Sequence, residues 1–221
     1  MGVAVVAVIL LRGRLKPAAL SRATGAPGNG FLLGLFAGVL ALDTWIARSV
    51  FSGRPLLIDE IVQLFQARIF AGGRLSLPVA PHREFFSMLH LVDTGDKVYS
   101  QFPPGGPAML MLGELAHAPW IVGPLCGAIS AVLFARLLRY TDPGASRVFH
   151  VGAAVLFAVA PFGAFMFGSH MNHATAALWL LVAVVGMARV GSWGHDTAEP
   201  GVAPGTATHP RRVFVTSDRR F

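Results

Sequence analysis

Four long apolar stretches constrain what this chain can fold into more than any other feature of its sequence. They cover residues 30–51, 118–138, 148–169 and 171–189. A helix needs about 20 predominantly apolar residues to cross the hydrocarbon core of a bilayer, and inside lipid only helices and closed barrels satisfy every backbone polar group. These runs lack the alternation of strands. The sequence therefore predicts an all-α integral membrane protein with about four transmembrane helices.

Charge is scarce in this chain and unevenly placed. Only 13% of the 221 residues are charged and 54% are hydrophobic, whereas an average soluble domain has about 25% charged residues. A net charge of +7 would raise nucleic acid as a partner of a soluble chain. Here the cations lie mostly between the apolar runs and in the tails, as the positive-inside rule describes. We therefore expect a lipid bilayer as the surroundings and no nucleic-acid partner.

The cationic clusters also predict an orientation. They are Arg12, Arg14, Lys16 and Arg22 before the first run, Arg136, Arg139 and Arg147 between the second and third, and Arg189 with the arginines of the tail after the fourth. Four spans place all three clusters on the cytoplasmic side. Residues 1–29, with a short apolar stretch at 2–11, and a disordered tail at 191–221 are then cytoplasmic, in the plasma membrane (the inner membrane of a bacterium). Residues 52–117 form an exoplasmic loop.

Two residues interrupt the apolar runs. Pro161 lies in the middle of the third run, and a tolerated kink is the common outcome for proline in a membrane helix. Asp43 lies inside the first run, where an acid is costly and usually faces a partner or a wet cavity. Arg48 is one candidate partner.

The predicted exoplasmic loop has its own local structure. Residues 61–70 place apolar side chains on one helical face and are followed by two glycines. Residues 86–92 and 97–102 are β-prone runs around the turn at 93–96, which predicts a small hairpin. Residues 106–115 form a shorter apolar run broken by Glu114, which favours a helix at the interface or re-entering the membrane.

Asp59 and Glu60 open the amphipathic segment, and two interpretations fit them. In the first, Asp59 is the N-cap of the helix and Glu60 stabilises the helix dipole. In the second, the acidic pair lies at the outer membrane surface, where a carboxylate can act as a general base on an incoming hydroxyl.

Cations and histidines in the two exoplasmic segments are candidates for ligand binding. Five cations, Arg54, Arg68, Arg74, Arg83 and Lys97, lie in the long loop. Most are expected to be solvated, but a lipid phosphate needs one or two partners, and arginine suits phosphate best. His170 and His173 are spaced to share a metal on a helix. No third ligand is evident nearby, so we expect no metal.

These features together resemble the amino-terminal part of a GT-C-type membrane glycosyltransferase, the superfamily of protein O-mannosyltransferases and lipid A aminoarabinose transferases. The likeness covers about Gly30 to Val190. Its motifs are Asp59-Glu60, Gln66-Ala67-Arg68 through Gly72-Gly73-Arg74 to Leu77-Pro78, Tyr99 to Gly105, a short helix and full span, Arg136 to Tyr140, and the run containing Pro161.

The resemblance implies a cell-envelope enzyme that moves a sugar from a polyprenyl-phosphate carrier to an exoplasmic acceptor without a cofactor. Asp59 would be the general base, with Glu60 as its neighbour. The residues expected to bind substrate are Arg54, Arg68, Arg74, Arg83, Lys97, Tyr99, Gln101, Pro103, Pro104, His170 and His173.

Other functions stay open beside this one. Superfamily members usually have more than four spans, so the expectation is a truncated or frame-disrupted copy, or one part of a split enzyme. A noncatalytic multi-pass protein that binds carrier lipid or a partner enzyme is the alternative. A transporter or channel subunit is disfavoured because charges are largely missing from the last three spans.

Overall fold

The computed structural model describes residues 27–196, and this part of the chain is mostly helical. The short apolar stretch at 2–11 and residues 197–221 of the predicted tail lie outside the described residues. Residues 191–196 belong to the last helix, so the prediction of disorder from residue 191 onwards is wrong at its first residues.

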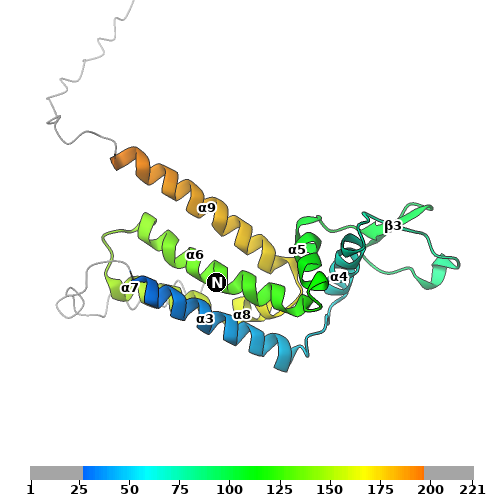
Figure 1. Cartoon of the computed structure of the whole chain (residues 1–221), viewed down its shortest axis with the longest axis horizontal. Helices are drawn as coiled ribbons and strands as arrows, with labels where there is room; N and C mark the ends of the chain where they lie inside the picture. The colour runs from blue at the N-terminus through cyan, green and yellow to red at the C-terminus, as the bar shows by residue number, and fades with distance from the viewer. Residues whose placement is uncertain (1–26, 197–221) are drawn as a thin grey trace, which may run out of the picture.

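Three helices are long and apolar enough to cross a membrane, and they lie side by side in Figure 1. They are α3 (Asn29–Trp45), extended by the π-helical turn Ile46–Val50, α6 (Val122–Thr141), preceded by the 3-10 turn Pro119–Ile121, and α9 (Asn172–Asp196). The apolar spans within them run over residues 29–50, 119–141 and 172–190, which agrees with the predicted first, second and fourth spans.

The core of this bundle consists of large side chains from α3 packed against alanines. Leu32, Leu35 and Val39 of α3 contact a row of buried alanines on α6 and on α7 (Arg147–Ala158). Small residues at a membrane helix interface let the backbones approach closely. The alanines therefore let α3 pack closely against α6 and α7, which the lengths of the apolar runs do not indicate.

The third predicted span is broken rather than kinked. Helix α7 ends at Ala158, and α8 (Pro161–Gly168) begins with the proline itself, the two being bent by 51°. Pro161 has no amide hydrogen to continue the hydrogen bonds of α7, but it suits the first position of a new helix. The tolerated kink is thus a full break, and the predicted third span exists only if α7 and α8 are counted together as one crossing.

A second group of elements lies at one end of the bundle, which we call the loop end. It contains α4 (Ile58–Ala71), α5 (Gly105–Leu115) and a three-stranded antiparallel sheet (Figure 1). The strands are β1 (Leu77–Pro78), β2 (Leu91–Asp93) and β3 (Lys97–Ser100), in the order β1-β3-β2. The predicted amphipathic helix, short helix and hairpin are all present, but residues 86–90 are not strand and β1 was not predicted.

Asp43 and Arg48 do not form the pair that the sequence made a candidate. Asp43 is fully buried and neither carboxylate oxygen has a hydrogen-bond partner in the described residues. The Arg48 guanidinium instead lies 4.8 Å from the ring centre of Trp120. A cation over the face of an indole is a favourable arrangement, and it holds the carboxyl-terminal end of α3 against the start of α6.

Candidate active site

Glu60, not Asp59, closes the amino-terminal end of α4. The helix begins after Leu57, whose backbone is extended, and Glu60 Oε2 accepts hydrogen bonds from the amides of Leu56 at 2.6 Å and Leu57 at 3.3 Å. These amides would otherwise lack a partner at the helix end. The N-cap interpretation of Asp59 is therefore wrong. Glu60 is buried and already occupied by this structural role.

Asp59 makes a side-chain contact that the sequence did not indicate. Its Oδ1 lies 3.0 Å from Nε2 of His90, a residue just before β2. The Asp59 side chain is 39% exposed, and no group in the described part of the chain donates a hydrogen bond to its Oδ2. One carboxylate oxygen is thus held in place while the other stays open to a ligand.

His90 is in turn held by the segment that leads into α5. The Gln101 amide nitrogen contacts His90 Nδ1, and the Gln101 backbone N–H donates to the His90 carbonyl at 3.0 Å. The ring of Phe102 lies 5.3 Å from the His90 ring. Of the predicted substrate-binding residues, Gln101 therefore joins Asp59 through His90. Tyr99 pairs with Val92 in the sheet, and Pro103 and Pro104 are exposed just before α5.

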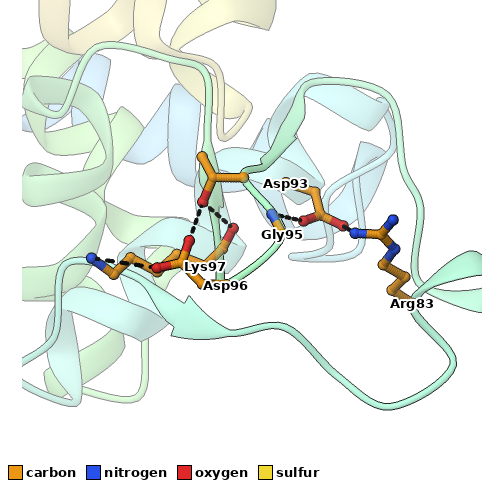
Figure 2. Close-up of polar contacts among 6 residues, drawn as sticks. Arg83, Asp93, Gly95, Asp96 and Lys97 are labelled. Atoms are coloured by element: carbon orange, nitrogen blue, oxygen red, sulfur yellow. Dashed lines mark hydrogen bonds and ion pairs between the residues drawn. The ribbon is translucent and has the colours of Figure 1, made fainter.

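Three of the five loop cations are already paired with acids of the chain. Arg68 Nε lies 3.0 Å from Glu114 Oε1. Arg83 lies 3.9 Å from Asp93, and Lys97 lies 3.9 Å from Asp96 (Figure 2).

The acids of the last two pairs lie at the turn between β2 and β3, whereas Arg83 comes from the 3-10 turn Arg83–Phe85. The Gly95 amide donates to Asp93 at 2.7 Å, a contact drawn in Figure 2. The Thr94 hydroxyl donates to Asp96 at 2.7 Å. The Thr94 hydroxyl, followed by Lys97, lowers the pKa of Asp96. Arg54 and Arg74 are exposed and form no ion pair among the described residues.

A buried polar cluster lies where α4, α5 and the connection from α8 to α9 meet. Gln63 and His170 are almost fully buried, and their side-chain nitrogen and oxygen atoms have no hydrogen-bond partner in the described residues. A Cβ added at Gly106 would lie 2.9 Å from both Gln63 Oε1 and Asn172 Cβ, so only glycine fits there. His173 is exposed. The two histidines, both expected to bind substrate, therefore lie in different surroundings.

Burial lowers the pKa of His170 from 6.5, although the carboxylates of Glu60 and Glu114 act in the opposite direction. His170 lies between the end of α8 and the start of α9, outside the apolar spans. The unfolded chain then binds a proton at a higher pH than the folded chain does. The stability that neutral His170 contributes is full above about pH 6.5 and is lost as the pH falls through the lower folded pKa.

The consequence can be measured as the temperature of unfolding between pH 7.5 and pH 5. We expect the unfolding temperature of the wild-type chain to fall on acidification more steeply than that of His170→Gln, because glutamine takes up no proton. The matched control is His173→Gln, which changes an exposed neighbour and should keep the wild-type slope. Equal slopes for all three chains would contradict the assignment to His170.

An apolar cavity of about 410 Å³ lies between α4, the sheet and the loop before β2. Its walls include Ile61 and Phe65 of α4, Leu91 of β2 and Val98 of β3. Phe85 and Phe86 line it from the loop and are largely exposed. Within residues 27–196, no three histidine, cysteine or acidic side chains are arranged to hold a metal ion.

In comparisons with protein-family models, with curated proteins and with solved structures, this chain matches none. The resemblance of its motifs to GT-C-type glycosyltransferases therefore stays a prediction.

Sequence reasoning found Asp59 and Gln101 but missed His90. No period or motif marks this histidine. The only sequence signal was its place next to a β-prone run, which puts it near the sheet edge but not against α4.

Proposed function

We propose that this protein is a membrane glycosyltransferase of the GT-C type, a hexosyltransferase that uses a polyprenyl-phosphate-linked sugar. The observation that carries the proposal is the Asp59 carboxylate at the loop end, 39% exposed, with Oδ1 3.0 Å from His90 Nε2. Within residues 27–196 no group donates a hydrogen bond to its Oδ2. A general base needs an accessible oxygen within hydrogen-bond reach of the acceptor hydroxyl.

The proposed reaction uses these groups in one displacement. The acceptor oxygen attacks the anomeric carbon, the bond from that carbon to the lipid phosphate breaks, and its electron pair leaves with the phosphate. The acceptor proton goes to Asp59 Oδ2. Arg54 and Arg74, which have no acidic partner in the described part of the chain, are the proposed contacts for the departing phosphate.

The distribution of charge supports an exoplasmic loop end. Arg136 and Arg139 lie in the last turns of α6, and Arg147 begins α7, at the end of the bundle opposite α4 and α5 (Figure 1). Arginines next to spans stay on the cytoplasmic side. The proposed site then faces the outer leaflet, where the carrier phosphate sits at the membrane surface.

This orientation predicts a labelling pattern in intact cells. In a Cys126→Ala background, Ser87→Cys should react with an impermeant maleimide from outside. Its matched control, Gly144→Cys in the exposed turn between α6 and α7, should react only after permeabilisation. The reversed pattern would contradict an exoplasmic site.

The function itself is tested with the purified full chain in liposomes that contain a polyprenyl-phosphate-linked hexose and a hydroxyl acceptor. We expect free polyprenyl phosphate and glycosylated acceptor to appear together at equal rates. Liposomes with an empty membrane provide the background rate. A chain that binds the donor lipid without releasing phosphate above that background would overturn the proposal and favour the noncatalytic lipid-binding alternative.

A further inference from the structure

We propose that His90 is the positioning residue of the site, fixing the orientation of the Asp59 carboxylate so that Oδ2 faces the acceptor. This inference rests on the proposed function, since it assigns a role in the same reaction. It concerns a residue that touches Asp59 rather than a substrate.

The hydrogen bonds around the ring define which nitrogen carries the proton. The Gln101 amide nitrogen, which contacts Nδ1, can only donate. Nδ1 must therefore accept, and in a neutral imidazole the single proton is then on Nε2. His90 Nε2 lies 3.0 Å from Asp59 Oδ1. In this tautomer the ring proton is therefore on the nitrogen next to the proposed base.

The backbone of His90 is held as firmly as its ring. Its φ of 68° is in the left-handed region, which is uncommon for a residue other than glycine. Here the surroundings are the hydrogen bond from the Gln101 amide to the His90 carbonyl and the Phe102 ring against the imidazole. The donor that reaches Asp59 therefore has little freedom to move.

A fixed donor matters because Asp59 is partly exposed and otherwise has freedom to rotate. When Oδ1 is held by His90, Oδ2 has one defined direction. The Asp59 carboxylate then does not have to be reoriented when the acceptor binds. A misplacement of about 1 Å in a reacting group can cost about 100-fold in rate. The loss is expected in kcat rather than in KM, because His90 makes no contact with a bound substrate in this scheme.

The loop contains a matched control for this histidine. His82 also has a left-handed backbone, with φ 58°, and also lies near an acid, Glu84, at 3.6 Å. Both of these side chains are well exposed, and the pair is not attached to α4. His82 thus shares the residue type, backbone conformation and acidic neighbour of His90 without its place beside Asp59.

The test compares variants of the full chain in the liposome transfer assay. We expect His90→Ala to lower kcat by about 10- to 100-fold with KM nearly unchanged. His90→Gln, whose amide nitrogen can still donate toward Asp59, should recover most of the lost rate. His82→Ala should keep the wild-type rate. Unfolding temperatures of all variants show whether any loss reflects the fold.

A second readout does not depend on activity. In ¹⁵N spectra of the histidine rings at pH 8.5, with the His90 signal assigned by its loss in His90→Gln, we expect protonated Nε2 and unprotonated Nδ1. The Nε2 signal should shift in Asp59→Asn. The opposite tautomer would overturn the inference whatever the enzyme does.

The remaining outcomes separate the two proposals. Loss of transfer in Asp59→Asn with a normal kcat in His90→Ala would overturn the positioning role alone. A loss in His90→Ala that His90→Gln does not restore, or that His82→Ala shares, would do the same. If no variant and no wild-type chain transfers sugar, both the proposed function and the positioning role are overturned, although the ring contacts remain measurable.

Discussion

Asp59→Asn is expected to lower kcat for sugar transfer by about 100- to 10,000-fold, the range that a positioned general base contributes. Asparagine has nearly the shape of aspartate, but its amide cannot take the acceptor proton. The side chain is 39% exposed, so little packing changes. The measurement is the initial rate of polyprenyl phosphate release at saturating donor, with the unfolding temperature recorded for the same sample.

Two matched variants serve as controls for Asp59→Asn. Asp96→Asn changes an exposed carboxylate in the turn between β2 and β3 and should leave the rate unchanged. Glu60→Gln keeps an oxygen that can accept from the Leu56 amide, so α4 should still begin correctly and most activity should remain. A full rate in Asp59→Asn together with its loss in Glu60→Gln would move the role of base to Glu60.

Gly123→Ala is expected to destabilise the bundle by about 3 kcal/mol, near the upper end for overpacking a tight interface. A Cβ at this position of α6 would collide with the backbone carbonyl of Phe167 and lie 2.7 Å from that of Ser169. Backbone atoms cannot rotate away as a flexible side chain can. Relief therefore requires α6 to move from the end of α8.

The control for this substitution is Gly152→Ala in α7, where a Cβ would meet nothing within 4 Å. Alanine is favoured over glycine in a helix by about 1 kcal/mol, so this variant should be as stable as the wild type or slightly more so. The measurement is unfolding in detergent followed by tryptophan fluorescence. Equal stability of the two variants would contradict the close approach of α6 and α8.

The apolar spans were predictable because membrane crossing depends on a local property, the length of an apolar run. The first, second and fourth predicted spans coincide with helices to within a few residues. The third run met the same length criterion, yet its helix breaks at Pro161. Sequence predicts that a proline disturbs a helix, but the packing of both halves decides whether the result is a kink or two helices.

The charged residues of the loop were predictable as a set but not in their pairing. Arg68, Arg83 and Lys97 were among the residues expected to bind substrate, and each lies beside an acid of the chain. The partner of Arg68 is Glu114, which is distant in sequence and comes close because α4 packs against α5. Only Arg83 and Lys97 have acidic neighbours within the hairpin itself.

The sequence by itself determined the helical membrane character of this chain, the location of its loop elements and the choice of Asp59 as the residue of interest. These follow from composition and short-range pattern. The tertiary structure alone decided that His90 lies beside Asp59 and that the Gln101 amide contacts the His90 ring. Those contacts join segments separated by a helix and a hairpin, and no local preference encodes which side chains meet when such segments pack together.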